Sequence, residues 1–271
     1  MMGYYFINSF KYIFNRFILR IPFLIAYSRK YDIKIKFKTE DGGGRKIYKL
    51  GIYEEDLSDY LLKHLNPKKG DIYIDIGANV GWYSVLLSKK FPEYLAIHAF
   101  EPDEVNFECL RYNLTLNNNI NVYAHQLAVA EKEGKAQLNL YKNSNIGRHS
   151  LLPINDGPSL EVATISLDEF LIKERVEIGK VQFVKIDIEG FELMAFRGAT
   201  KLLMSVPLIL AEYSPGYMRK GGLSPESLLD LLLAYDYFPH YLIEGALVRA
   251  DKKELLALNT NVNLFWVKQK D

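Results

Sequence analysis

Between residues 6 and 21, apolar residues recur every three or four positions and share one side of a helical wheel, while Asn, Ser, Lys and Arg share the other. The pattern predicts an amphipathic helix with a basic polar face. Such a helix lies on an anionic membrane surface, docks to a partner protein or packs on its own domain, and the sequence leaves these alternatives open. The apolar side consists of Phe6, Ile7, Phe10, Ile13, Phe14, Phe17, Ile18 and Ile21.

Residues 31–38 alternate between apolar and polar side chains, as in a half-buried strand. The glycine-rich sequence at 41–44 predicts a turn, and residues 46–50 a second short strand. We therefore expect a hairpin at the end of an N-terminal basic arm, residues 1–50, and a second domain at residues 51–271.

Beyond Tyr53, short apolar strands alternate with helical patterns, which is typical of a mainly parallel sheet with helices on both faces. The expected fold is therefore α/β and Rossmann-like. We predict strands at 72–76, 95–100, 121–125, 181–186, 208–212, 238–243 and 263–267, with further short strands and loops between 128 and 165. Helices are predicted at 55–65, 82–90, 103–116, 167–173, 191–203 and 225–234.

The composition fits a globular chain, because 271 residues with 49% hydrophobic and 25% charged residues can bury one sizeable core. A net charge of +1 gives no global basic field, so we expect no nucleic-acid partner. The charge is uneven, since residues 1–50 hold 11 Lys and Arg against 3 Asp and Glu. The basic character therefore lies in the arm.

Cys109 is the sole cysteine, which excludes an intrachain disulfide and a cysteine-based zinc cluster. It lies in a predicted helix, where we expect a packed thiol. The apolar run at 21–27 is far shorter than the ~20 residues that span a bilayer, and no signal-peptide cleavage pattern follows it. We expect a cytoplasmic protein, and attachment to the inner face of a membrane through residues 6–21 stays open.

The clearest chemical signal is the sequence DIGANVG at residues 75–81, where a buried strand passes into a helix. Glycines there let the backbone approach a ligand, and the free N–H groups of a helix N-terminus suit a polar or anionic group. Asp75 can pair with an amino group. Glu101 closes the next strand, where an acid can bind ribose hydroxyls. The glycine spacing differs from the diphosphate loop G-x-G-x-x-G, so the two acids predict an adenosine-type ligand other than NAD.

These motifs resemble the FkbM family of methyltransferases over roughly residues 50–245. The resemblance implies a class I methyltransferase fold, S-adenosylmethionine as methyl donor and, most often, O-methylation of a hydroxyl on a sugar, glycan or glycolipid. An N-methyltransferase and a non-catalytic donor-binding scaffold that recruits a glycosylation partner are the alternatives. The matching segments are Tyr53-Glu54, residues 75–81, residues 100–102, Asn113, residues 127–129 with Gly134, residues 164–168 and residues 184–190.

Class I methyltransferases bind the donor outside the carboxyl ends of the first strands. Residues that the sequence places at or just after these ends form the predicted donor site, together with Glu54 from the matching segment Tyr53-Glu54. They are Glu54, Asp75, Gly77, Ala78, Asn79, Gly81, Glu101, Pro102, Gln126 and Ala128.

Asp187 and Glu189 follow the strand at 181–186 and share one face because alternate side chains point the same way. We predict that Asp187 accepts the proton of the acceptor hydroxyl or orients this hydroxyl, and that Glu189 positions the substrate. Capping of the following helix is the alternative. His149, in a Gly- and Asn-rich segment at 143–150 that we expect to form a lid, is a second candidate base.

The acceptor pocket is predicted to include Lys185, Glu212, Tyr213 and Ser150. A Mg²⁺ ion held against a diol by Asp187, Glu189 and Glu212 is a less favoured alternative, because local spacing fixes no third ligand, and we assign no metal-binding residues. The acceptor's identity and a homo-oligomeric state are left open.

Overall fold

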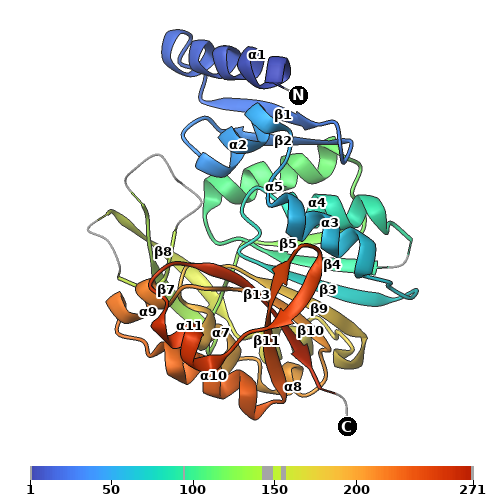
Figure 1. Ribbon diagram of the computed structural model, residues 1–271, viewed down its shortest axis with the longest axis vertical. Helices are drawn as coiled ribbons and strands as arrows, with labels where there is room; N and C mark the ends of the chain where they lie inside the picture. Colours follow the sequence, from blue (N-terminus) through green and yellow to red (C-terminus); the bar gives the residue numbers. More distant parts are fainter. Residues whose placement is uncertain (1, 94, 142–148, 154–156, 270–271) are drawn as a thin grey trace.

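A mixed eight-stranded sheet forms the centre of the computed structural model, which describes residues 2–93, 95–141, 149–153 and 157–269 (Figure 1). The strand order is β12-β11-β13-β10-β9-β3-β4-β5. Strands β3, β4, β5, β9 and β10 are parallel, and β13 runs antiparallel between β10 and β11. The strands are β3 (Asp71–Ile76), β4 (Leu95–Phe100), β5 (Val122–His125), β9 (Val181–Ile186), β10 (Leu208–Tyr213), β11 (Tyr237–Ile243), β12 (Ala246–Arg249) and β13 (Val262–Lys268).

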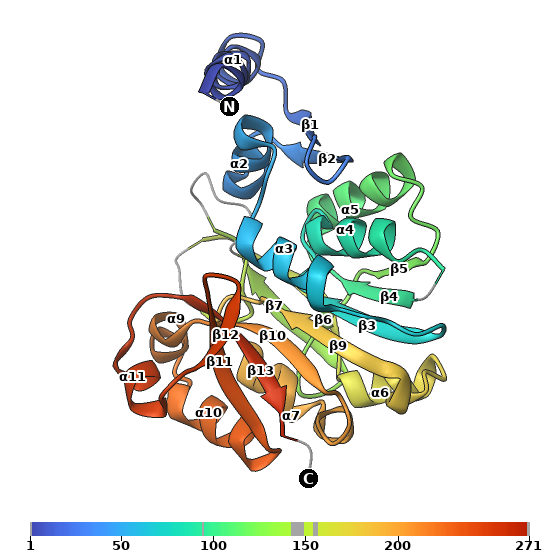
Figure 2. The same cartoon turned by 45° about the vertical axis from the view of Figure 1, so that its right-hand side comes forward.

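Helices cover both faces of this sheet (Figures 1 and 2). One face carries α3 (Glu55–His64), α4 (Trp82–Lys90) and α5 (Glu104–Leu116), and the other carries α6 (Leu167–Lys173), α7 (Glu192–Arg197), α8 (Thr200–Leu203) and α10 (Pro225–Ala234). Strand alternation divides the core accordingly: Phe183 packs with the first set, and Val184 with the second. The predicted α/β fold is confirmed, and α4, α6, α10, β4 and β9 have their predicted bounds.

The region predicted to hold short strands forms a separate three-stranded sheet of order β6-β8-β7. Its strands are β6 (Ala128–Val129), β7 (Gly134–Asn139) and β8 (Ser159–Ile165). The helix predicted at 191–203 is instead two short helices, α7 and α8. They are separated at Gly198, where an added Cβ would lie 2.4 Å from the carbonyl oxygen of Ala130. Two further helices, α9 (Pro215–Lys220) and α11 (Lys252–Ala257), have no counterpart in the sequence prediction.

The prediction of a strand at 46–50 is wrong, because these residues belong to helix α2 (Gly42–Leu50). Asp41 caps this helix by accepting a hydrogen bond from the Gly44 N–H, and Gly51 ends it with φ +74°. The hairpin forms instead between β1 (Phe23–Ser28) and β2 (Ile33–Lys38). The mostly apolar residues 23–28, which precede the predicted strand at 31–38, therefore form the second strand of the hairpin.

The hairpin packs against helices α4 and α5. Ile33, Ile35 and Phe37 are fully buried in the same core cluster as residues of α4 and α5. The Asn113 side chain accepts from the Lys36 N–H at 2.7 Å and donates to the Lys36 carbonyl at 2.9 Å. The boundary that we place at residue 50 stays a prediction.

Helix α1 (Met2–Ile13) continues as a π-helical turn, η1 (Phe14–Ile18), so the N-terminal helix begins and ends earlier than predicted. It stands at the end of the molecule opposite the C-terminus (Figures 1 and 2). Within the described residues, no helix combines the length and hydrophobicity that crossing a membrane requires.

Candidate active site

The loop after β3 brings two strand ends into close approach. Gly77 has φ +72°, and a Cβ added to it would lie 2.0 Å from the carbonyl oxygen of Asp187. The Asp187 N–H in turn donates to the Ile76 carbonyl at 3.0 Å. The N–H groups of Gly77 and Ala78 both donate to the Phe100 carbonyl. Glycine at position 77 therefore lets β3, β4 and β9 converge at one point of the sheet edge.

Glu101 lies at the end of β4 and is 5% exposed. Its two carboxylate oxygens accept from the backbone N–H groups of Asn79 at 2.8 Å and Asp103 at 3.0 Å. Burial raises the pKa of Glu101 to about 8, although the hydrogen bonds from Asp103 and Asn79 oppose this shift. The group is therefore a buried acid held rigidly at the loop.

Asp75 lies behind the loop in a buried charged cluster. One oxygen accepts from the Ser84 hydroxyl at 2.6 Å, and the other has no hydrogen-bond partner among the described residues. Lys185 Nζ lies 4.0 Å from Asp75 and 3.4 Å from Asp187. Burial lowers the pKa of Lys185, but the negative charges of Asp187 and Asp75 have the larger combined effect, so the lysine pKa is raised above its ordinary value. Burial raises the pKa of Asp75, against the influence of Lys185.

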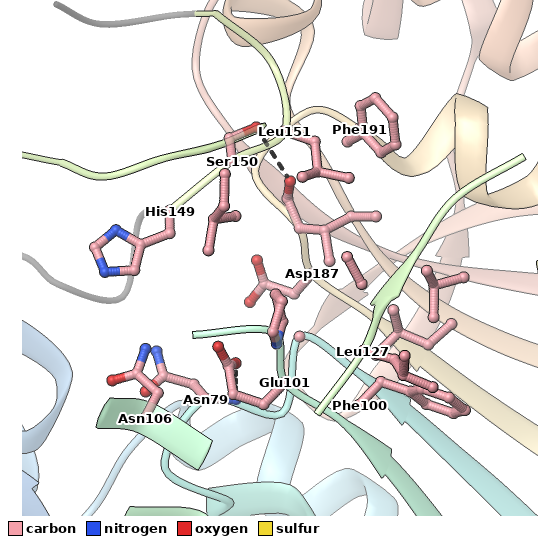
Figure 3. A pocket seen from close by; sticks show the side chains of 17 residues that line it. Asn79, Phe100, Glu101, Asn106, Leu127, His149, Ser150, Leu151, Asp187 and Phe191 are labelled. Atoms are coloured by element: carbon pink, nitrogen blue, oxygen red, sulfur yellow. Dashed lines mark hydrogen bonds between the residues drawn. The ribbon is translucent and has the colours of Figure 1, made fainter. Parts of the chain in front are cut away.

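A first cavity opens between the loop after β3, the end of β4 and the three-stranded sheet (Figure 3). Figure 3 shows Asn79, Asn106 and His149 on one side of it, Phe100 and Leu127 on the other, and Glu101 and Asp187 between them. The enclosed volume is about 50 Å³. The lining residues are Ile76, Gly77, Asn79, Phe100, Glu101, Pro102, Asn106, Leu127, Ala128, Val129, Leu138, His149, Ser150, Leu151, Asp187, Ile188 and Phe191.

A second cavity of about 420 Å³ lies beside the first and is strongly charged. Gly77, Asn79 and Asp187 line both cavities, so the two adjoin at these residues. Helix α2 contributes one wall, including Arg45 and Lys46. The remaining lining residues are Asp41, Gly42, Gly43, Gly44, Ile47, Tyr53, Glu54, Ala78, Val80, Trp82, Tyr83, Lys185, Glu189 and Glu212.

Three carboxylates gather in the second cavity. One oxygen each from Asp187, Glu189 and Glu212 lies within 4.8 Å of the others. Glu212 therefore supplies the third acid that local sequence spacing does not fix. Burial and the charge of Asp187 raise the pKa of Glu212 to about 8, which fits a cluster in which one carboxyl keeps its proton near neutral pH.

The helix-capping alternative for Asp187 and Glu189 stays a prediction, and both residues line the second cavity. Helix α7 begins after Phe191 without a side-chain cap, and the N–H groups of Ile188 and Gly190 donate to the Glu192 carboxylate at 3.0 and 3.3 Å. Glu192 thus satisfies two N–H groups of the turn that precedes α7.

His149 and Ser150 line the first cavity, which shares Asp187 but neither Glu189 nor Glu212 with the carboxylate cluster. His149 Nδ1 accepts from the Tyr141 N–H at 3.2 Å, and its Nε2 lies 4.0 Å from Asp103. Burial lowers the pKa of His149, and Asp103 opposes this. The lid predicted at 143–150 stays a prediction, because Asn143 to Arg148 lie outside the described residues.

The structure brings most predicted site residues to the two cavities and leaves four outside them. Asp75 lies behind the loop, and Gly81 approaches Leu110, whose Cδ1 would be 2.5 Å from an added Cβ. Gln126 is exposed, and Tyr213 is buried in the core. Gly77, Asn79, Glu101, Pro102, Ala128, His149 and Ser150 line the first cavity, and Glu54, Ala78, Lys185, Glu189 and Glu212 line the second.

Sequence reasoning missed the contribution of α2 and of two aromatic residues, Tyr53 and Tyr83, to the second cavity. It also missed Asn106 in the first cavity. A signal for Asn106 exists, because Asp103 caps α5 by accepting from the Asn106 N–H, which fixes this residue beside Glu101.

The sheet is mainly parallel, with β12 and β13 antiparallel, and it carries a glycine loop after β3 and a buried acid after β4. These are the features of an S-adenosylmethionine-dependent methyltransferase of class I. The methyltransferase domain of METTL16 has the same fold, with a TM-score of 0.50 and 13% sequence identity, covering 97% of this chain and 80% of that one.

The chain belongs to the FkbM family of methyltransferases, since residues 75–239 match the methyltransferase FkbM domain. It is 28% identical to the hexuronic acid methyltransferase AglP of Haloferax volcanii over 179 residues, which cover 66% of this chain and 67% of AglP. It is also similar to the crystal structure of methyltransferase FkbM from Methylobacillus flagellatus KT, with 17% identity and a TM-score of 0.47. That match covers 76% of this chain and 47% of the other.

Proposed function

We propose that the first cavity binds S-adenosylmethionine, that the second binds a sugar-type acceptor, and that Asp187 directs transfer of the methyl group to a hydroxyl of this acceptor. The observation that carries the proposal is the position of Asp187, which lines both cavities where they adjoin. A group that promotes transfer between two bound molecules needs this position.

The first cavity suits the donor chemically. Its apolar side, with Phe100 and Leu127, fits a base, and Glu101 fits the ribose hydroxyls. At about 50 Å³ the cavity is smaller than the ~300 to 1,000 Å³ of typical ligand pockets, so we expect a wall to withdraw when the donor binds.

S-adenosylmethionine supplies a methyl group bonded to a sulfonium sulfur. When the acceptor oxygen bonds to the methyl carbon, the carbon–sulfur bond breaks and the sulfur leaves as a neutral thioether. Asp187 orients the acceptor hydroxyl and receives its proton. Lys185 Nζ, 3.4 Å away, places a positive charge beside the Asp187 carboxylate. Alignment of reactants can supply ~7 to 11 kcal/mol, more than a general base does, so the walls that fix the acceptor matter more than proton removal.

The charged walls of the second cavity support a polar acceptor. Glu54, Glu189 and Glu212 offer hydrogen-bond acceptors to hydroxyls, and Arg45 and Lys46 offer donors from α2. AglP is, by its name, a methyltransferase of hexuronic acid, which is a sugar acid. A sugar-type acceptor therefore agrees with both the cavity and the name of this relative.

Transfer of labelled methyl from S-adenosylmethionine to hexuronic acids, neutral sugars and amino sugars tests this proposal. We expect methyl ethers on oxygen, identified by the carbon shift of the new methyl group. Methylation confined to the nitrogen of amino sugars would favour the N-methyltransferase alternative. Donor binding without product from any acceptor would favour the scaffold alternative.

Donor binding is expected to release a proton near neutral pH. Because burial raises the pKa of Glu101 to about 8, the ligand-free protein holds a proton there below that pH. Ribose hydroxyls are bound best by the ionised carboxylate, so binding lowers this pKa and expels the proton. Affinity should rise up to about tenfold per pH unit until about pH 8 and then level off. Calorimetry with S-adenosylhomocysteine in two buffers of different ionisation enthalpy measures the released proton.

Glu101→Gln should abolish the proton release and weaken binding by about 10- to 100-fold, since hydrogen bonds to a charged group contribute roughly 1.5 to 3 kcal/mol. Glu104→Gln, an exposed acid in the first turn of α5, is the matched control and should change neither quantity. Equal proton release by Glu101→Gln and the parent protein would contradict the assignment.

A further inference from the structure

The segment from Tyr5 to Leu19 exposes an extended row of large apolar side chains. Each has between 41% and 71% of its surface accessible to solvent. Soluble monomers rarely expose contiguous apolar patches of this kind unless the patch binds something. We call this set the apolar face; it consists of Tyr5, Phe6, Ile7, Phe10, Ile13, Phe14, Phe17, Ile18 and Leu19.

The helix turns its polar side to its own domain, the reverse of an ordinary surface helix. Tyr12 is 2% exposed, and its hydroxyl donates to the Thr39 carbonyl at 2.5 Å. The Asn8 side chain donates to the Tyr48 carbonyl at 3.2 Å, which joins α1 to α2. These contacts fix the rotation of α1, so the apolar face points away from the protein.

Positive charge surrounds the apolar face. The first acidic residue of the chain is Asp32, so residues 1–31 carry only basic charges. No described carboxylate lies within 4.0 Å of the cationic groups of Lys11, Arg16 or Arg20. Arg16 stacks over the Phe17 ring at 5.0 Å and reaches the Tyr12 hydroxyl at 2.8 Å. An anionic partner complements this surface, whereas a second copy would bring like charges together.

We propose that the apolar face inserts into the interface of an anionic phospholipid bilayer, with α1 and η1 lying in the plane of the membrane. Aromatic and aliphatic side chains on one side with basic residues beside them are the features of interfacial helices. Lys11 and Arg20 can extend to headgroup phosphates while the phenylalanines enter the acyl region. The docked end is the one that carries α2, whose residues also line the second cavity, and lies opposite the C-terminus (Figure 1).

Sedimentation of the protein, residues 1–271, with vesicles tests this proposal without an acceptor or an activity assay. We expect binding to vesicles with equal parts of phosphatidylglycerol and phosphatidylcholine, and binding at least about tenfold weaker to phosphatidylcholine alone, because each basic residue near an anionic surface adds several-fold in affinity. Added salt should weaken binding to the anionic vesicles.

A double variant, Phe10→Glu with Phe14→Glu, should lose at least about tenfold in binding to the anionic vesicles, since it places two acids in the acyl region. The matched control, Ile120→Glu with Met204→Glu, makes the same change at exposed apolar residues that are 90% and 67% accessible elsewhere, and should bind like the parent. Circular dichroism checks that both variants fold.

Three results would overturn the proposal. The first is a folded parent protein that sediments with neither kind of vesicle. The second is an equal loss of binding in the control variant. The third is a parent dimer in gel filtration that binds no vesicles and becomes monomeric in the Phe10→Glu, Phe14→Glu variant, which would make the apolar face an interface between copies.

Discussion

An Asp187→Asn enzyme is expected to transfer methyl groups about 10²- to 10⁴-fold more slowly than the parent protein, because asparagine keeps the size of the side chain but cannot take a proton. Asp187 lines both cavities, so donor affinity should also change, but by much less than kcat. Single-turnover methyl transfer, together with calorimetry of donor binding, separates the two effects. Residual activity is expected, since alignment of the reactants survives the substitution.

Asp56→Asn provides the matched control, because Asp56 is an exposed acid in the first turn of α3 and lines neither cavity. It should leave kcat and donor affinity unchanged. If Asp187→Asn retained full activity with every acceptor that the parent methylates, Asp187 would not be the group that directs the hydroxyl.

A Gly77→Ala protein is expected to lose about 10²-fold in activity and about 2 to 5 kcal/mol in free energy of unfolding. Alanine at φ +72° is strained by about 1 to 2 kcal/mol, and the overpacking of its Cβ, 2.0 Å from the Asp187 carbonyl, costs about 1 to 3 kcal/mol more. Relief of this clash moves the peptide that carries Asp187, and a displacement of about 1 Å can cost 10²-fold in rate. Urea unfolding and methyl-transfer kinetics measure the two losses.

Gly70→Ala separates strain from steric overlap. Gly70 has φ +88°, but an added Cβ would have no heavy atom within 4 Å. This variant should lose only the strain of about 1 to 2 kcal/mol and keep its activity. Equal losses in both variants would mean that the close approach of β3 and β9 does not explain the glycine at position 77.

The strands and helices of the central sheet were largely predictable, because their hydrophobic patterns are local. Strand β9 and helix α6 have their predicted bounds, and Asp103 caps α5 at the predicted start of that helix. The short elements α9, β12 and α11 were not predicted, since four to six residues carry too little periodicity to identify a helix or a strand.

The donor side of the candidate site was more predictable than the acceptor side. Gly77, Asn79 and Glu101 follow consecutive strands in the sequence, and in a parallel sheet such strand ends meet at one edge. The acceptor side depends on α2, which the sequence predicted as a strand. The apolar residues at 47, 48 and 50 fit one side of a short helix as well as a strand. The cap by Asp41, which accepts from the Gly44 N–H, belongs to the helix.

The sequence by itself determined the α/β class, the glycine loop with its following acid and the amphipathic character of the N-terminal segment. Each of these can be recognised from hydrophobic patterns and motifs within short segments of the chain. The tertiary structure alone decided which carboxylates meet, since Glu212 and Asp187 are 25 positions apart and come together through the pairing of β9 and β10. It also decided that α1 points its apolar face outwards. The helical pattern gives two faces, but only the contacts of Tyr12 and Asn8 with the domain determine which one remains exposed.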